Sequence, residues 1–466
     1  MHSSFTRRRF LGTAASLASL TVAGRAAPAV PSAGSLDSFR EPARDLPLAG
    51  AADVIVCGAG PAGVTAAITA ARTGARVRLF EAHGALGGVW TTGLLGFLLD
   101  FNKPGFNQEL VRELDRRDAR RLPSASSMTY EPEEMKLILD ELCADAGVTV
   151  QLHTRVAAAH RDGRRVATIV TESKSGRQAW RAPVFIDTTG DGDLGALAGC
   201  EWEFGESKDC PCQPMSMDAL LVVQDHRALQ EFIHGTTSAE TTKAKRAFLA
   251  EIKRAGVTPS YTMPTLFPIR DNLILAMMNH EFGIKPFDAA QVTAATMRAR
   301  GELHRIVRGL RKLGGPWAGL QIAATPEQIG IRDGRRIRGR YVVNREDVVA
   351  GARHDDAVVR ATFGVDIHAY DRVHADGGYT NAGVKAKPYD IPFRALLARD
   401  VDGLLLAGRC ISGDYIAHAS YRVTGNAVAM GEAAGAAAAL AAATQRLPHE
   451  VEWRDVTTVR DKTRRG

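Results

Sequence analysis

Residues 52–82 read ADVIVCGAGPAGVTAAITAARTGARVRLFEA, and this stretch decides the fold. It predicts a short buried strand at 54–56, a glycine turn, an alanine-rich helix, and a second strand that ends on Glu81. The turn carries the glycine spacing of a dinucleotide-binding unit, at Gly58, Gly60 and Gly63. Such glycines permit a tight turn, close approach of a diphosphate and close helix packing. We expect the diphosphate at the helix N-terminus and the adenosine ribose at Glu81.

A second match to the same glycine pattern, at 190–195, has unsuitable chemistry. Its sequence GDGDLG places Asp191 and Asp193 where they would repel an anionic diphosphate. Glycine spacing alone is therefore weak evidence. The assignment of the first copy rests on its flanking strands, its helix and its terminal acid.

The N-terminal residues carry the pattern of an export signal. Residues 6–11, TRRRFL, match the twin-arginine signature, and a mildly apolar run at 10–24 leads to small residues at 27–29. The run is too short and too rich in Ala, Ser and Thr for a membrane span, which needs about 20 strongly apolar residues. We expect residues 1–29 to be a twin-arginine signal peptide, followed by a linker at 30–50. A disordered basic tail is the alternative.

Charge and cysteine spacing argue against several functions. The net charge is +7, but residues 1–29 hold four arginines and no acid, so the remainder carries +3 and does not predict nucleic-acid binding. The six cysteines include no C-x-x-C, haem or iron–sulfur motif, and we predict no metal site. Cys210 and Cys212 are the one close pair. Two loop thiols are the favoured interpretation, with a disulfide or half a metal site as alternatives.

The rest of the chain predicts an α/β fold in which a cap interrupts the nucleotide-binding part. The predicted helices are 133–146, 239–255, 289–313 and 426–443, and the predicted strands are 148–152, 156–161, 165–172, 182–187, 338–343 and 403–408. We expect a nucleotide-binding domain at 51–205 and 331–445. A largely helical cap domain would occupy 206–330, with a frayed tail at 446–466.

These features resemble the FAD-dependent oxidoreductase family whose flavin domain is related to the fumarate reductase and succinate dehydrogenase flavoproteins. The resemblance covers about residues 51–440. Beyond the first unit it rests on LGG at 86–88, FIDTTGDGDL at 185–194, IRDGRRIRG at 331–339, DIH at 366–368 and LLAGRCIS at 405–412. Relatives usually show Glu and Ser where this chain has Asp333 and Gly334, which leaves the substrate open.

The resemblance implies an FAD-binding Rossmann-like domain of the glutathione-reductase type. It implies non-covalent FAD, because no histidine falls where some relatives attach the flavin. The first turn of the helix at Asn426 would face the isoalloxazine and stabilise the anion that forms on reduction. The implied cofactor-binding residues are Gly58, Gly60, Pro61, Ala62, Gly63, Glu81, Ala82, Gly87, Gly88, Val156, Thr189, Gly190, Asp191, Gly408, Arg409 and Asn426.

A flavin dehydrogenation needs a group that accepts a proton and positive charge that orients an oxygenated substrate. His368, in the DIH motif, and Arg422 are the first candidates, and His418 is the alternative base. A structural histidine is the other interpretation of His368. Arg332 and Arg335 belong to a cluster of four arginines in seven residues, which a solvated basic face explains equally well.

We therefore expect an exported FAD-dependent dehydrogenase, periplasmic or extracellular, that transfers hydride between a small oxygenated substrate and flavin N5. The twin-arginine route carries folded proteins, which suits a flavin inserted in the cytoplasm. An exported enzyme meets no useful pool of nicotinamide cofactor, so electrons would pass to a separate acceptor: a quinone, a cytochrome or oxygen. Two alternatives stay open: a fumarate-reductase-type enzyme fed by a membrane or cytochrome donor, and a non-catalytic flavin-binding subunit.

Overall fold

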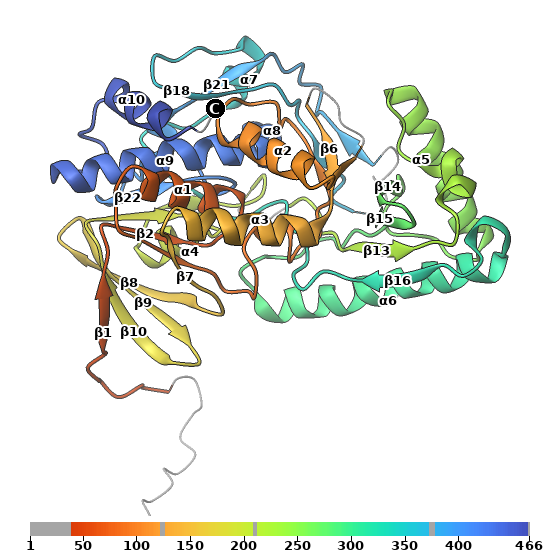
Figure 1. The fold of residues 1–466 in the computed structure, drawn as a ribbon, viewed down its shortest axis with the longest axis horizontal. Helices are drawn as coiled ribbons and strands as arrows, with labels where there is room; N and C mark the ends of the chain where they lie inside the picture. The colour runs from red at the N-terminus through yellow and green to blue at the C-terminus, as the bar shows by residue number, and fades with distance from the viewer. Residues whose placement is uncertain (1–38, 122–125, 208–211, 372–377, 465–466) are drawn as a thin grey trace, which may run out of the picture. The chain divides into compact units, whose positions relative to one another are not determined.

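The first predicted strand, Val54–Cys57 (β2), lies at the centre of a five-stranded parallel sheet in the computed structural model (Figure 1). The structure describes residues 39–121, 126–207, 212–371 and 378–464. The sheet has the order β22-β11-β2-β3-β7, formed by Leu404–Leu406, Val184–Asp187, β2, Val77–Phe80 and Thr149–Gln151. All four residues of β2 are buried, as a parallel sheet covered on both faces requires.

Two helices cover one face of this sheet and a second sheet covers the other (Figure 1). The helices are Pro61–Arg72 (α1) and Thr424–Thr444 (α9), and both contact β2 and β11. The second sheet has the order β1-β10-β9-β8, formed by Leu48–Ala51, Gly176–Arg181, Arg165–Ser173 and Arg155–Asp162. Phe80 of β3 packs on Trp180 of β10, with 5.1 Å between the ring centroids.

Glycines allow α1 and α9 to pack backbone to backbone. A Cβ added at Gly431 would lie 2.3 Å from the carbonyl oxygen of Ala62, and one added at Gly435 would lie 2.3 Å from that of Ala66. The alanine-rich sequence of α9 therefore has a packing reason, because larger side chains would separate the two helices. By length and composition α9 is the one described helix that could cross a membrane, but it is almost entirely buried in the core.

Residues 206–330 include two long helices and a four-stranded antiparallel sheet. The helices are Ser238–Arg254 (α5) and Ala289–Leu313 (α6). The sheet order is β14-β15-β13-β16, formed by Thr265–Arg270, Leu273–Met277, Asp218–Val222 and Gln321–Ala324. One face, with Ala219 and Leu221, joins the apolar core of α5 and α6, and the other face, with Leu220 and Leu275, packs on Leu94. The short strands of this region thus form a single sheet between two apolar layers.

The remaining described elements are short or lie at the edges. The helices are Phe106–Arg116 (α2), Pro132–Asp145 (α3), Asp193–Leu197 (α4), Arg345–Ala350 (α7), Tyr415–Tyr421 (α8) and Trp453–Thr463 (α10), and the 3-10 turns are Gly88–Trp90, His226–Phe232, Gly315–Trp317 and Phe393–Leu396. The strands are Phe97–Leu98 (β4), Arg120–Arg121 (β5), Met128–Tyr130 (β6), Trp202–Glu203 (β12), Arg336–Ile337 (β17), Ala357–Ala361 (β18), Ile367–His368 (β19), Tyr379–Thr380 (β20) and Tyr389–Pro392 (β21).

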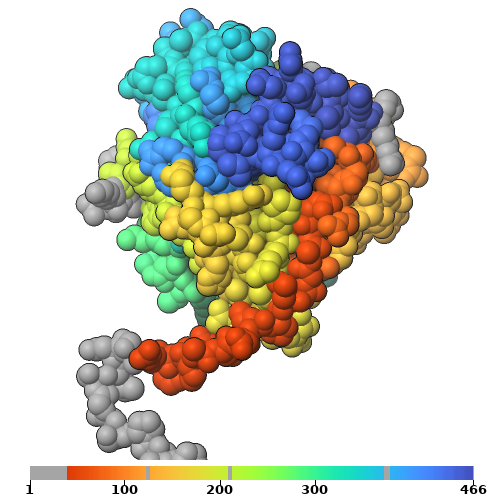
Figure 2. Space-filling view, turned by 90° about the vertical axis from the view of Figure 1, so that its left-hand side faces the viewer, coloured from red at the N-terminus to blue at the C-terminus, as the bar shows by residue number. Residues whose placement is uncertain are grey.

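The structure corrects three predictions about local structure. The C-terminal tail is not frayed: α10 packs on α1 and α9, and Figure 2 shows these last residues (dark blue) against the first part of the chain (orange). Arg464, just after α10, pairs with the buried Glu432 of α9, which explains why this charged segment is ordered. The predicted linker includes β1. The segment predicted as a strand at 338–343 is irregular, and the strand in this region is β17, which lies directly before it.

The described residues from 46 to 464 form one compact unit, and residues 39–45 belong to a separate N-terminal part. The predicted signal peptide lies outside the described residues. The division into nucleotide-binding and cap segments stays a prediction.

Candidate functional site

The glycine turn after β2 combines two tightly packed glycines with one open glycine. Gly58 has φ +95°, and a Cβ there would lie 2.6 Å from the Thr188 carbonyl oxygen. A Cβ on Gly63 would lie 1.8 Å from the carbonyl oxygen of Gly58. By contrast, a Cβ on Gly60 would meet no protein atom within 4 Å. Packing explains the first two glycines, whereas Gly60, at the N-cap of α1, leaves space for a ligand.

Glu81 fixes this turn from the end of β3. Its carboxylate accepts the backbone N–H of Ala59 at 2.7 Å and that of His83, beyond Ala82, at 2.9 Å. The backbone N–H of Gly87 donates to the Ala59 carbonyl oxygen at 2.8 Å, and a Cβ on Gly88 would lie 3.0 Å from Gly60 Cα. The predicted residues of the first unit and of the 87–88 pair therefore lie together around one turn.

The end of β11 brings a second turn to the same edge of the sheet. The Thr188 hydroxyl donates to the carbonyl oxygen of Gly58 at 2.6 Å. Asp187 accepts the backbone N–H and the hydroxyl of Thr189, and burial raises the pKa of this carboxyl to about 6. Arg409 lies 2.9 Å from Asp191 and balances its charge. This pairing lessens the anion repulsion predicted for the 190–195 segment, where Gly190 lies against the same guanidinium.

The first turn of α9 completes the edge. Asn426 is fully buried, and neither polar atom of its side chain has a hydrogen-bond partner in the protein. A buried amide without partners costs about 1–3 kcal/mol, so these atoms fit the polar groups of a ligand. Gly408, after β22, has φ +86° and touches Ala62 of α1, close to the N-cap Gly60.

The residues at this edge fit a dinucleotide. The open glycine lies at a helix N-terminus, where backbone N–H groups bind a diphosphate. The buried Asn426 amide provides unsatisfied polar atoms. Val156 lies on β8 and is buried, which places it on the second sheet.

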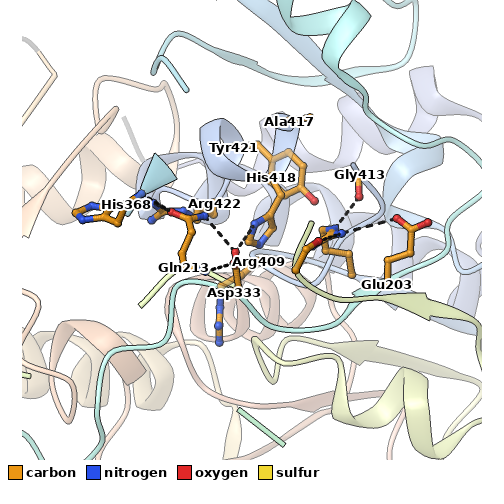
Figure 3. Close-up of polar contacts among 12 residues, drawn as sticks. Glu203, Gln213, Asp333, His368, Arg409, Gly413, Ala417, His418, Tyr421 and Arg422 are labelled. Carbon is orange, nitrogen blue, oxygen red and sulfur yellow. Dashed lines mark hydrogen bonds and ion pairs between the residues drawn. The ribbon is translucent and has the colours of Figure 1, made fainter. Parts of the chain in front are cut away.

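A second polar cluster lies between β19, α8 and the segment after residue 212 (Figure 3). Its centre is Gln213, which is 2% exposed. The Gln213 side-chain oxygen accepts the backbone N–H of His368 at 3.1 Å and Arg422 Nη2 at 3.2 Å. Its side-chain nitrogen donates to Asp333 at 3.1 Å, and its backbone N–H donates to the same carboxylate at 2.6 Å. Gln213 thus joins two predicted catalytic residues to a residue from a third segment.

Asp366 pairs with both His368 and Arg422. Its Oδ2 lies 3.4 Å from His368 Nε2 and 3.1 Å from Arg422 Nη2. Burial raises the pKa of Asp366, but His368 and the nearby guanidinium groups outweigh it and hold the pKa well below the usual range. Burial, together with the charge of Arg332, lowers the pKa of His368 to about 4. His368 is therefore neutral at pH 7, and its buried Nδ1 has no hydrogen-bond partner in the protein.

Arg332 lies beside this cluster with other ionisable groups. Its Nη1 donates to the Pro214 carbonyl oxygen and the Ser216 hydroxyl, both at 2.8 Å. Asp218 of β13 is 6% exposed, its Oδ1 has no hydrogen-bond partner, and burial raises its pKa to about 7. A buried carboxyl with such a shift is typical of functional sites. His280 packs on His368, with 5.0 Å between ring centroids, and burial lowers its pKa well below the usual value.

Of the other predicted catalytic residues, His418 adjoins the cluster and Arg335 lies elsewhere. His418 is fully buried, 3.3 Å from Asp333, and burial lowers its pKa to about 4. Burial raises the pKa of Asp333, but hydrogen bonding by His418 and Gln213 outweighs it and leaves the pKa at about 2. Arg335 pairs with Asp193 at 2.9 Å and covers the ring of an exposed phenylalanine, so it belongs to the 191–193 turn.

The cysteines differ from the favoured interpretation. Cys212 is disulfide-bonded, so it is not a free thiol. Cys210 lies outside the described residues. Within the described ranges no group of three or more His, Cys, Asp or Glu residues could hold a metal ion.

The sequence did not indicate Gln213 or Asp218 as site residues, and it did not indicate that Asp366 pairs with His368 and Arg422. Asp366 had a usable signal, because residues two apart on an extended segment face the same side, which places Asp366 beside His368. Gln213 and Asp218 carry no such pattern. Their roles depend on contacts between segments that are distant in sequence.

Two of the solved structures that match this chain do so with low TM-scores and low identity. The myxobacterial chondrochloren halogenase CndH matches with a TM-score of 0.47 and 13% identity, over 88% of this chain and 78% of the halogenase. A geranylgeranyl bacteriochlorophyll reductase-like protein from Thermoplasma acidophilum matches with a TM-score of 0.41 and 14% identity, over 89% of this chain and 82% of that protein. Comparison with curated proteins gives no match.

The family comparison covers most of the chain. The family described as FAD dependent oxidoreductase matches residues 53–462, from the start of β2 to the last turn of α10. This range contains both the dinucleotide edge and the His368 cluster. The chain therefore belongs to the FAD-dependent oxidoreductase family, and its cofactor is FAD.

Proposed function

We propose that this protein is an exported FAD-dependent dehydrogenase of a small oxygenated substrate, such as a sugar derivative, an alcohol or a carboxylic acid. The observation that carries the proposal is the cluster in which His368 and Arg422 share Asp366 and Gln213. Two residues after Arg422, α9 begins, and its first turn holds the unpartnered Asn426. The short stretch of chain from Arg422 to Asn426 thus links the cluster to the candidate cofactor edge.

Non-covalently bound FAD supplies a two-electron acceptor for the substrate hydride. The residues of the first turn would hold its diphosphate, and the α9 N-terminus with Asn426 would stabilise negative charge on the flavin. A separate acceptor, a quinone, a cytochrome or oxygen, would take the electrons.

His368 is suited to receive the substrate proton. Its low pKa leaves the imidazole neutral, with an unpartnered Nδ1. Asp366, 3.4 Å from Nε2, would stabilise the imidazolium that forms. Arg422 and Arg332 place positive charge where an oxygenated substrate can be oriented. Asp218 is a buried, unpartnered carboxyl close enough to Arg332 to interact with its charge.

An anaerobic substrate screen tests this function. The visible flavin band of purified protein is followed during incubation with panels of sugars, alcohols and carboxylic acids. A dehydrogenase predicts bleaching by members of one chemical class without any partner protein. Reduction that occurs only with a reduced quinone or cytochrome donor would favour a reductase of the fumarate reductase type instead.

The substitution Gly60→Val should abolish FAD binding. A Cβ at this position meets no protein atom within 4 Å, so the fold should tolerate the change, but the side chain occupies the space where the diphosphate approaches. Gly364→Val is the matched control, because that glycine also has open surroundings and no positive φ. Flavin content after purification and the melting temperature of the apoprotein are measured. Full FAD occupancy in Gly60→Val would contradict the assigned cofactor edge.

The substitutions His368→Ala and Arg422→Ala should each retain FAD and slow substrate-dependent bleaching by about 10²–10⁴-fold. Wild-type bleaching should also slow as the pH falls toward about 4, because His368 must be neutral to accept a proton. Stopped-flow absorbance measures both effects. His354→Ala, a half-buried histidine that packs on Tyr341, is the control. Wild-type speed in His368→Ala would return His368 to a structural role.

We also propose that the protein is exported by the twin-arginine route. This proposal is supported by the sequence of residues 6–11 and by the disulfide at Cys212, because disulfides persist in oxidising compartments. Replacing Arg7 and Arg8 with Lys keeps the charge but removes the guanidinium pair. The precursor should then accumulate inside the cell with FAD bound, measured by fractionation and flavin fluorescence. Unchanged export of the double variant would reject this route.

A further inference from the structure

Gln213 forms hydrogen bonds that connect segments distant in sequence, and its own position in the sequence suggests no such role. Its side chain and its backbone N–H together contact Asp333, His368 and Arg422, which come from three separate segments (Figure 3). The residue is 2% exposed, so water does not replace these bonds. Asp333 is itself 3% exposed and accepts both N–H groups of Gln213.

The chemistry of the partners allows one orientation of the Gln213 amide. The ionised Asp333 carboxylate only accepts hydrogen bonds, so the amide NH₂ must face it. Arg422 and the His368 backbone N–H only donate, so the amide oxygen must face them. Asp333 therefore determines where the acceptor for Arg422 lies.

Without this acceptor, Arg422 Nη2 keeps only the contacts to Asp366, at 2.9 Å to its carbonyl oxygen and 3.1 Å to its carboxylate. The guanidinium would shift toward the Asp366 charge. A shift of this kind changes how much positive charge reaches the space in front of the α9 N-terminus.

We propose that Gln213 is a positioning residue that holds Arg422 and the His368 backbone in one geometry toward the bound flavin, with Asp333 as its anchor. This inference rests on the proposed function, in which Arg422 and His368 face the flavin. Gln213 contacts neither flavin nor substrate and acts through these two residues.

Sulfite is a suitable probe because it tests the charge near the flavin without the natural substrate. It donates an electron pair to N5, forms an N–S bond and leaves negative charge on the flavin ring, which bleaches the visible band. Nearby positive charge stabilises this adduct. The sulfite dissociation constant, measured on FAD-loaded protein, therefore reports the placement of Arg422.

Three variants and one control define the experiment. Gln213→Met removes all three side-chain hydrogen bonds at similar volume. Gln213→Asn keeps an amide that is too short to reach both partners, and it provides the same test if the Met variant fails to fold. The double variant Gln213→Glu/Asp333→Asn reverses the polarity of the pair, because the new amide at position 333 donates to the new carboxylate at position 213. Its net charge matches that of the wild type, but the negative charge moves from position 333 to position 213, in contact with Arg422.

Gln291→Met is the matched control. Gln291 also donates to an aspartate, Asp288, at 2.9 Å, and its side-chain oxygen accepts the Lys285 backbone N–H at 3.1 Å. It lies at the start of α6, among none of the candidate catalytic residues. Its loss removes an equivalent glutamine–aspartate pair without affecting Arg422.

The Met and Asn variants should retain FAD and weaken sulfite binding by about 10-fold or more, as expected when a hydrogen bond to a charged group is lost. The double variant should weaken sulfite binding at least as much, because its carboxylate at position 213 offsets the charge of Arg422, and Gln291→Met should match the wild type. Unchanged sulfite affinity in Gln213→Met or Gln213→Asn would overturn the proposal, as would wild-type affinity in a folded, FAD-loaded double variant. A wild-type holoprotein that forms no adduct would also overturn it. Failure of the proposed function gives a different result: the sulfite pattern holds, but no substrate bleaches the flavin.

Discussion

The close approach of three backbone segments is the constraint on which the rest of this structure depends. The turn at Gly58, helix α1 and helix α9 meet at distances that no side chain could enter, because a Cβ at Gly63 or Gly431 would overlap a carbonyl oxygen. This packing fixes the N-terminus of α1 beside the first turn of α9. Two helix N-termini then lie at one edge of the sheet, which is favourable for an anionic cofactor. Gly60 is the exception, since its open surroundings are left for the ligand.

The cluster around Gln213 shows how the protein keeps buried charge stable. Asp366 is shared between a neutral histidine and Arg422, and the ionised Asp333 accepts two hydrogen bonds from Gln213 and lies 3.3 Å from His418. Buried charges are costly unless they are paired and hydrogen-bonded. Here the pairing leaves His368 Nδ1 without a partner, as a proton acceptor requires. The same balance makes the site sensitive to the loss of one neutral residue, Gln213.

The sequence predicted the elements whose signal is local. The unit from β2 to β3, the strands β8 and β9, and the helices α5, α6 and α9 follow from periodicity and glycine positions, and the structure confirms them within a few residues. Strand β10, which lies between β1 and β9 in the second sheet, was missed because its six residues mix polar and apolar types without clear alternation. Helix α10 was missed because its order depends on tertiary contacts, including those of Arg464 with Glu432 and of Trp453 with Phe393.

The candidate site was only partly predictable for the same reason. The glycines of the cofactor edge lie within one local motif, so their grouping could be read from the sequence. The cluster around His368 joins segments near residues 213, 333, 366 and 422, and no spacing rule connects them. Arg335 shows that closeness in sequence is not enough. It lies near Arg332 in the sequence, but its side chain contacts the 191–193 turn and not the His368 cluster.

A crystal structure of the FAD-loaded protein tests the central claim most directly. In that structure we expect the FAD diphosphate to bind at the backbone N–H groups around Gly60, and the side-chain amide of Asn426 to form hydrogen bonds with the cofactor. We also expect Gly58 and Gly63 to stay where they are, because protein packing and not the ligand determines their positions. FAD bound at another surface, with Gly60 facing solvent and Asn426 still without a partner, would contradict the account.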